Sequence, residues 1–137
     1  LFSGKASCIN CHFGNDFTNG GFENIGTYDG QAYNDKGRGG ATGNANDNGL
    51  FKVPSLRNVA LTAPYMHDGR FETLEQVLDF YSEGVRSSAN IDSKMSAAHR
   101  GGVHLSADEK RKIIAFLHTL SDSSFLTNPA FSNPFAE

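Results

Sequence analysis

The sequence predicts an all-α domain with few helices, in which long ordered loops make up much of the chain. Two segments in the second half repeat apolar residues at helical spacing behind a capping box. The first third, by contrast, is rich in glycine and asparagine, which do not support long helices. A length of 137 residues suits one modest domain with a single core.

Charge and hydropathy argue against several classes of protein. The net charge is -3, the isoelectric point is near 5.9 and no long basic run is present, which argues against binding to nucleic acid or to an anionic membrane surface. No apolar run is long enough to span a membrane, and no signal-peptide pattern is present. Because the chain begins at Leu1 without an initiator methionine, we expect a processed protein or a fragment.

The two cysteines of the chain, Cys8 and Cys11, stand in the stretch "CINCH". Their spacing fits a redox disulfide, half of a zinc site or the two thioether links of a haem. A thioredoxin-like dithiol needs a βαβ context, which the sequence lacks, and a zinc site needs further ligands at matching spacing. His12 follows directly and completes C-x-x-C-H, the signature of c-type haem attachment.

We therefore predict one covalent haem c, with Cys8 and Cys11 bonded to its vinyl groups and His12 as the first axial ligand of the iron. The predicted fold class is then an all-α, cytochrome c-like domain whose loops wrap around the haem. Because covalent attachment of this kind occurs outside the bacterial cytoplasm, we expect an exported, periplasmic protein.

Residues 1–137 are expected to form a single domain. Its first half should contain one short helix and long loops. Residues 1–13 should form a helix that ends in the haem motif. Residues 14–72 should form haem-wrapping loops, since ten of the fifteen glycines and seven asparagines lie between positions 14 and 49. The apolar residues expected to face the haem from these loops are Phe17, Phe22, Ile25 and Tyr28.

Residues 73–120 are expected to contain the two main helices. The first should span about residues 74–83, because Thr73 and Gln76 form a capping box in front of an apolar face. The residues of that face are Leu74, Val77, Leu78 and Tyr81.

The second main helix is expected to begin at Ser106, where Glu109 completes another capping box. Its apolar face comprises Ile113, Ile114, Leu117 and Leu120. Residues 121–137 contain two Asn-Pro turns, and we expect them to form an extended tail.

The stretch "PYMHDGRF" offers candidates for a second axial ligand. Met66 and His67 are both metal-ligating residue types, and Pro64 and Gly69 mark the stretch as a turn. From the residues alone Met66 is favoured, since His/Met is a common ligand pair in c-type cytochromes. Met95, in a polar loop, is a further candidate.

Three stretches resemble the C-terminal haem domain of the bacterial di-haem cytochrome c peroxidase and MauG family: "CINCH", "FKVPSLRNVALTAPYMHDGRFETLEQVLDFY" and "LSADEKRKIIAFLHTL". The resemblance covers nearly the whole chain. In that family two cytochrome c-like domains each carry a haem; peroxide reacts at the N-terminal haem, and the C-terminal haem accepts electrons and relays them inward. Because this chain has one haem motif, the resemblance implies that it is the relay half.

The resemblance also implies a different sixth ligand. In the family this ligand lies on the helix after the turn, and it is a methionine in the peroxidases and a tyrosine in the MauG branch. Aligned on "TLEQ", the position falls on Tyr81, which the resemblance therefore favours over Met66. The alternative for Tyr81 is a core tyrosine with a hydrogen-bonded hydroxyl, and for Met66 a loop residue that fills a gap in the core.

Other roles follow from the same resemblance. It implies that His67 lies beside the haem near an interdomain interface, where it could tune the haem or take part in electron transfer; the alternative is a turn histidine bonded to backbone. The segment from Thr62 to Pro64 matches one whose backbone carbonyls help to bind an interdomain calcium. Arg57 and Arg38 are candidates to pair with haem propionates, and the alternative for each is a solvated surface arginine.

The predicted function is electron transfer through a covalent haem c, as the C-terminal relay domain of a di-haem cytochrome c peroxidase or MauG-like protein. The alternative is an enzyme: the intact protein, or this chain itself, reduces hydrogen peroxide at a haem, which requires an open iron position. Expected partners are the N-terminal haem domain of a di-haem protein or a small redox donor protein. The sequence leaves open whether two copies associate as a homodimer.

Overall fold

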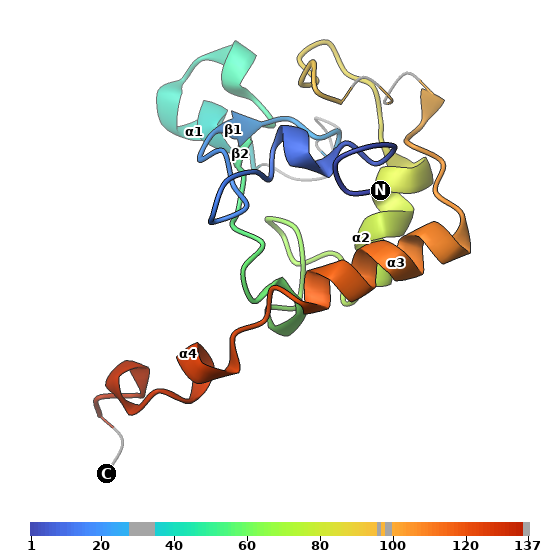
Figure 1. Ribbon diagram of the computed structural model, residues 1–137. Helices are drawn as coiled ribbons and strands as arrows, with labels where there is room; N and C mark the ends of the chain where they lie inside the picture. Colours follow the sequence, from blue (N-terminus) through green and yellow to red (C-terminus); the bar gives the residue numbers. More distant parts are fainter. Residues whose placement is uncertain (28–34, 96, 98–99, 136–137) are drawn as a thin grey trace.

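The computed structural model describes residues 1–27, 35–95, 97 and 100–135, and Figure 1 shows their arrangement. The described residues contain four α-helices and one two-stranded antiparallel sheet. The helices are α1 (Arg38–Thr42), α2 (Leu74–Asp79), α3 (Ala107–His118) and α4 (Ser123–Thr127), and the strands are β1 (Phe22–Glu23) and β2 (Phe51–Lys52). Shorter helical turns are η1 (Cys8–Asn10), η2 (Ala45–Asp47), η3 (Val59–Leu61), η4 (Phe80–Gly84) and η6 (Pro129–Phe131).

The prediction of an all-α fold class was wrong, because a small sheet joins the two ends of the glycine-rich loop. Phe22 pairs with Lys52 and Glu23 pairs with Phe51 in antiparallel register. Two-residue strands are too short to produce a visible alternation in the sequence, so only the folded loop reveals the pairing. The sheet positions Glu23 and Phe51, which both line the cavity described below.

The segment predicted as a helix over residues 1–13 contains only the single 3-10 turn η1. Ser7, directly before this turn, has φ 54°, a left-handed conformation that an α-helix cannot accommodate. This turn still places the histidine of the motif close to the two cysteines. The backbone N–H of His12 donates to the Cys8 carbonyl at 2.9 Å, so one helical turn separates the first cysteine from the histidine.

The first predicted capping box is confirmed. The Thr73 side chain accepts a hydrogen bond from the Gln76 backbone N–H, and the Gln76 side chain accepts one from the Thr73 backbone N–H. The helix continues beyond α2 as the π-helical turn η4. Such turns are rare in proteins as a whole, and those that occur are often found at functional sites. At this turn the Tyr81 carbonyl accepts the Val103 N–H at 3.0 Å, which anchors a neighbouring loop to it.

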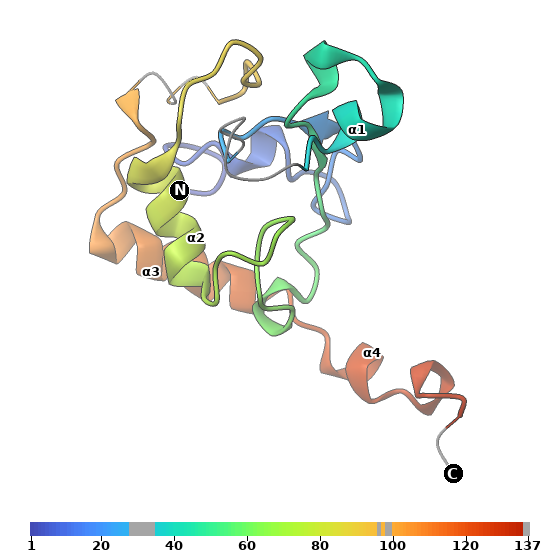
Figure 2. The same cartoon turned by 180° about the vertical axis from the view of Figure 1, so that it is seen from behind.

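The second predicted capping box is also confirmed: Ser106 and Glu109 exchange hydrogen bonds at the start of α3. The apolar face of α3 packs against α2, and the two helices lie next to each other in Figures 1 and 2. The buried residues of this cluster are Leu74, Leu78, Leu105, Ile113 and Leu117. None of the described helices has the length and apolar character needed to cross a membrane.

The predicted extended tail contains two short helical turns, α4 and η6. The Asp122 side chain caps the first and the Asn128 side chain caps the second, which explains why both form so close to the end of the chain. Both views show this segment leading away from the body of the molecule (Figures 1 and 2).

Candidate haem site

A cavity of about 930 Å³ occupies the centre of the body, between the N-terminal segment, α2, α3 and the loops. A volume of this size lies within the range of pockets that hold cofactors, about 300–1,000 Å³. Its wall is mostly apolar, and it draws on both helices of the main cluster. Apolar lining residues include Val53, Leu74, Val77, Leu78, Ile113 and Leu117.

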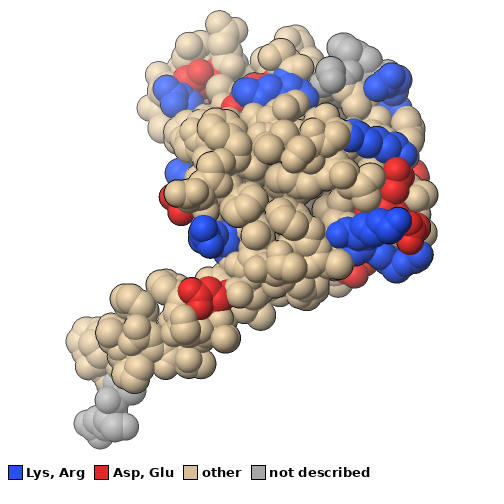
Figure 3. Space-filling view, in the orientation of Figure 1, with Lys and Arg blue, Asp and Glu red and all other residues tan. Residues whose placement is uncertain are grey.

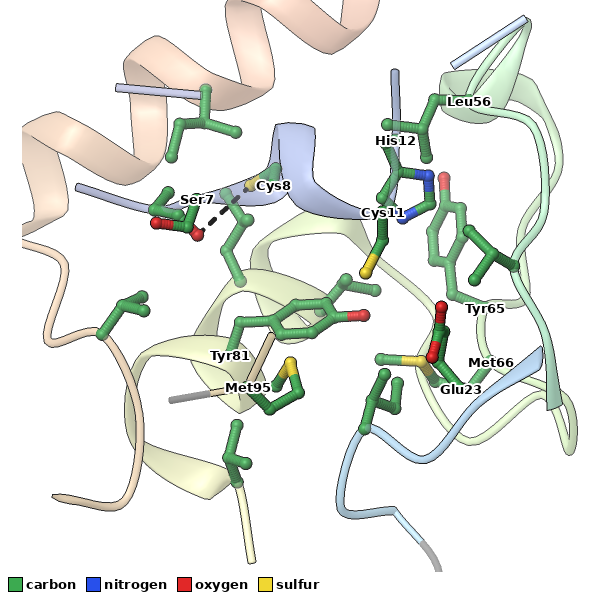
Figure 4. A pocket seen from close by; sticks show the side chains of 18 of the residues that line it. Ser7, Cys8, Cys11, His12, Glu23, Leu56, Tyr65, Met66, Tyr81 and Met95 are labelled. Carbon is green, nitrogen blue, oxygen red and sulfur yellow. Dashed lines mark hydrogen bonds between the residues drawn. The ribbon is translucent and has the colours of Figure 1, made fainter. Parts of the chain in front are cut away.

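The turn η1 brings both cysteines to this cavity. Figure 4 shows the Cys8 and Cys11 side chains at the same pocket as His12, and all three line it. Both thiols are unpaired, without a disulfide between them. The spacing of the motif therefore places two thiols and one imidazole on one wall of one cavity.

The ionisation of the thiols argues against a reactive dithiol. Burial raises the pKa of Cys8 to about 11, and it also raises the pKa of Cys11, with the negative charge of Glu23 adding to the effect. Cysteines that exchange disulfides have lowered pKa values, because the thiolate is the reactive form. These thiols are protonated at neutral pH, which disfavours the redox-disulfide reading of "CINCH".

The imidazole of His12 is held in one tautomer. Nδ1 lies 2.9 Å from the Phe17 carbonyl oxygen, and because a carbonyl can only accept, the ring must donate from Nδ1. Burial lowers the pKa of His12, although the hydrogen bond to the Phe17 carbonyl and the nearby Pro54 carbonyl oppose this, so the ring is neutral at pH 7. A neutral ring protonated on Nδ1 has its lone pair on Nε2, which is the form that binds a metal.

Tyr81 points into the same cavity from the π-helical turn η4 (Figure 4). Burial raises its pKa above the ordinary value for tyrosine, and the nearby thiols of Cys8 and Cys11 contribute to the shift. No hydrogen bond to its hydroxyl occurs within the described residues. The choice between an iron ligand and a core tyrosine with a hydrogen-bonded hydroxyl stays a prediction.

The two methionines of the chain also reach this cavity. Met66 and Met95 both line it, and both pack with Tyr81 against the buried residues Phe80 and Val85. Met66 has φ 70° and lies in a turn closed by the bridge between residues 65 and 71. Tyr81, Met66 and Met95 are thus brought together, and the choice of sixth ligand between them stays a prediction.

His67 lines the cavity, with its ring stacked on Phe51 of β2. The ring centroids are 3.5 Å apart and the planes differ by 12°. His67 as a whole residue is exposed, while only 16% of its side chain is exposed. Burial lowers the pKa of His67, and the Asp68 carboxylate, 4.0 Å away, opposes this. The stacking partner Phe51 left no signal in the sequence.

The two arginines predicted to pair with propionates are placed outside the lining of the cavity. Arg57 is 53% exposed and lies 3.8 Å from an Asp16 carboxylate oxygen. Arg38 pairs with Asp47 at 3.3 Å and covers the Phe22 ring. The basic residues that do line the cavity are Lys5, Lys52, Lys94 and Arg100, which sequence reasoning missed.

The predicted apolar wall of residues 17–28 is only partly present. Ile25 lines the cavity, whereas Phe22 is 40% exposed and its neighbour Glu23 turns inward. The reason is an ion pair: Lys94 Nζ lies 2.9 Å from Glu23 Oε1, so the buried carboxylate is compensated. Phe17 packs edge-on against two phenylalanines instead, and Tyr28 lies outside the described residues.

The segment predicted to help bind calcium lies at the edge of the cavity. Thr62 and Pro64 both line it, and the Thr62 hydroxyl donates to the Val59 carbonyl at 3.1 Å. Within the described part of the chain, no group of three or more His, Cys, Asp and Glu side chains is arranged to hold a metal ion. Calcium binding by the backbone carbonyls of Thr62 and Pro64 therefore stays a prediction.

Comparison with known proteins supports the predicted resemblance. No protein-family model matches the sequence. MauG of Methylorubrum extorquens is 38% identical over 122 residues, which are 88% of this chain and 32% of that protein. Cytochrome c551 peroxidase of Nitrosomonas europaea is 36% identical over 125 residues, again 88% of this chain and 32% of the relative. The chain thus spans about a third of the length of these curated relatives.

The fold has a counterpart among solved structures. The crystal structure of a MauG-like protein associated with microbial copper homeostasis matches 99% of this chain with a TM-score of 0.78. The sequence identity is 37%, and the match covers 49% of that molecule. The whole described fold, including its C-terminal turns, therefore corresponds to about half of a larger protein.

Proposed function

This chain is a homologue of MauG and of the cytochrome c peroxidases, and on that premise we propose that it binds one covalent haem c and transfers electrons through it. We further propose that it acts as the C-terminal relay domain of a di-haem protein. The relatives establish haem-based electron transfer or peroxidase chemistry in general terms. The specific relay role is inferred from the single haem motif and from the share of the relatives that the chain spans.

One observation carries the proposal: a single large cavity joins two protonated thiols, a neutral imidazole and an apolar wall. These residues fit a c-type haem. Cys8 and Cys11 would form the thioether bonds, and Nε2 of His12 would bind the iron. A haem held there supplies one-electron redox chemistry at its iron, while the chain supplies its orientation, its ligands and the exclusion of water.

We propose that Tyr81 would bind the haem iron together with His12, with Met66 and Met95 as the alternatives. The hydroxyl of Tyr81 has no hydrogen-bond partner within the described residues, and its side chain points into the cavity beside the thiols. Because its pKa is raised, the Tyr81 side chain is a neutral phenol when no metal is bound. A ferric iron held there would favour the phenolate, because a bound cation reverses the local preference for the neutral form.

We favour the relay role over the alternative in which this chain, by itself, reduces peroxide. Reduction of peroxide needs an open iron position, whereas the candidate iron ligands Tyr81, Met66 and Met95 all line the cavity. Peroxidase activity of the intact protein, with a second haem elsewhere, stays the second candidate because cytochrome c peroxidases are among the relatives. Steady-state reduction of peroxide with a reduced dye distinguishes the two, and rapid turnover by the isolated chain would favour the enzyme.

Several further assignments belong to the same proposal. The chain is exported to the periplasm, because haem attachment to C-x-x-C-H occurs there. Calcium binds near Thr62 and Pro64 when a partner domain completes the site. His67, which lines the cavity and stacks on Phe51, tunes the haem or takes part in electron transfer. Arg57 binds a propionate only if its side chain turns away from Asp16.

The experiment that tests the proposal is acid-acetone extraction of the purified chain, followed by a ferric absorption spectrum. A thioether-linked haem stays with the polypeptide, whereas a merely coordinated haem is extracted. We expect the haem to stay, and the spectrum to show a six-coordinate, low-spin iron. A colourless chain, or a haem that leaves the polypeptide, contradicts the proposal.

A further inference from the structure

The hydrogen bond between His12 and the Phe17 carbonyl depends on an unusual backbone conformation. Phe17 has φ 49°, in the left-handed region, which is uncommon for a residue with a bulky side chain. Its own N–H donates to the Gly14 carbonyl at 3.3 Å, and the Thr18 N–H donates to the Phe13 carbonyl at 3.1 Å. Because a left-handed conformation costs free energy in such a residue, it persists only where surrounding contacts hold it in place.

The side chain of Phe17 is held by two other phenylalanines. Its ring lies edge-on to Phe2 at 6.2 Å and to Phe116 at 6.0 Å, measured between ring centroids. The centroids of Phe2 and Phe116 are 4.9 Å apart, so these three rings, called the aromatic cluster below, all contact one another. Aromatic pairs in such arrangements stabilise a structure beyond the apolar area that they bury. Because Phe2 belongs to the N-terminal segment and Phe116 to α3, the cluster joins distant parts of the chain around Phe17.

Charged groups contribute little to this hold on Phe17. Figure 3 shows the face that carries the N-terminal segment and α3, and the middle of this face is uncharged. At the edge of the loop Arg57 lies 3.8 Å from Asp16, but their side chains are 53% and 78% exposed, and pairs this exposed stabilise a fold only weakly. Phe2 and Phe116, by contrast, both pack against the buried core between α2 and α3. The Phe17 ring is therefore held by apolar contacts with a fixed surface.

The aromatic cluster reaches the cavity only indirectly on the side of α3. Among the described residues that line the cavity, neither Phe17 nor Phe116 is present. The Phe17 carbonyl oxygen nevertheless lies 2.9 Å from Nδ1 of His12, whose ring does line the cavity. A continuous set of contacts thus leads from Phe116 through the Phe17 ring and backbone to the imidazole.

We propose that Phe2 and Phe116 are positioning residues for the haem ligand His12. Through the Phe17 ring they hold the Phe17 carbonyl oxygen at Nδ1 of the imidazole, and so they fix the strength of that hydrogen bond. A strong bond from Nδ1 raises the basicity of Nε2, which favours the ferric state of a bound iron. The link to the iron rests on the proposed function of His12, whereas the contacts of the aromatic cluster do not.

The test is Phe116→Leu in the haem-loaded protein, with Ile114→Ala as the matched control. Ile114 is on the same helix and packs against the same core, but it lies outside the aromatic cluster and outside the lining of the cavity. In Phe116→Leu we expect the midpoint reduction potential to rise. The Nδ1 proton of His12, followed by NMR, should exchange with water about tenfold faster. In Ile114→Ala both quantities should stay unchanged, although the free energy of unfolding falls.

Two further variants separate positioning from general packing. Phe116→Tyr keeps the ring and should behave like the parent chain. Phe2→Leu removes the other ring that contacts Phe17 and should change both quantities in the same direction, so it decides the question where Phe116→Leu does not fold. Parent values in both leucine variants, or equal changes in Ile114→Ala, would overturn the inference. A parent chain without haem contradicts the proposed function, while exchange of the Nδ1 proton still tests the positioning role.

Discussion

Nδ1 of His12 lies 2.9 Å from the carbonyl oxygen of Phe17, five residues further along the chain. This contact is possible because Phe17 has φ 49°, a left-handed conformation that turns the loop back on the haem motif. The loop is fixed in turn by the Thr18 hydroxyl, which donates to the Val53 carbonyl at 2.7 Å. A backbone carbonyl thus sets the tautomer of the imidazole, as hydrogen bonds to the second ring nitrogen do for metal-bound histidines in many proteins.

Removal of this imidazole is expected to change the iron but not the attachment. In His12→Ala the thioether-linked haem should remain, while the low-spin absorption of the ferric state disappears because the axial nitrogen is lost. His118→Ala, at an exposed position on α3, is the matched control and should leave the spectrum unchanged. A low-spin spectrum that survives in His12→Ala would show that another residue is the proximal ligand.

Substitution of Tyr81 is expected to distinguish the three candidate sixth ligands. Tyr81→Phe removes only the hydroxyl, so the low-spin signal should be lost, whereas Met66→Ala and Met95→Ala should have little effect on it. A phenolate favours ferric over ferrous iron, so the redox potential should rise in Tyr81→Phe. A weak sulfur-to-iron band at the red end of the ferric spectrum, lost in Met66→Ala and kept in Tyr81→Phe, would assign the ligand to Met66.

Gly102 is expected to be essential for the shape of the π-helical turn. A Cβ atom on this residue would collide with the backbone carbonyls of Tyr81 and Ser82, and its φ of 143° disfavours any other residue. Gly102→Ala should lower the free energy of unfolding by about 3 kcal/mol and alter the ferric spectrum. Gly4→Ala is the control, because nothing lies within 4 Å of its added Cβ. Equal stability of the two variants would contradict the close packing.

The haem-free chain is expected to lose stability at alkaline pH. Burial raises the pKa of Cys8 from 9.0 to about 11, so in this window the folded chain holds a proton that the unfolded chain has released. The free energy of unfolding should therefore fall as pH rises from about 9 to about 11, by at most about 3 kcal/mol from this thiol. Urea unfolding at several pH values measures it. The haem-loaded chain, whose thioethers do not titrate, should lack this part of the loss.

The features that the sequence determined are local ones. Both capping boxes form as predicted, because each uses hydrogen bonds between residues three apart. The spacing of "CINCH" likewise suffices to bring Cys8, Cys11 and His12 to one wall of one cavity, since a single turn spans it. The resemblance to MauG and the peroxidases, drawn from three short stretches, is confirmed by the comparisons.

The features that only the tertiary structure decided depend on residues far apart in the sequence. The fold class was predicted wrongly because β1 and β2 are two residues each and meet only when the long loop closes. The same pairing turns Glu23 inward and Phe22 outward, against the hydrophobic expectation, since Lys94 supplies a charge 71 positions away. Tyr81, Met66 and Met95 converge on the cavity for the same reason: contacts across the chain, not spacing along it, place them there.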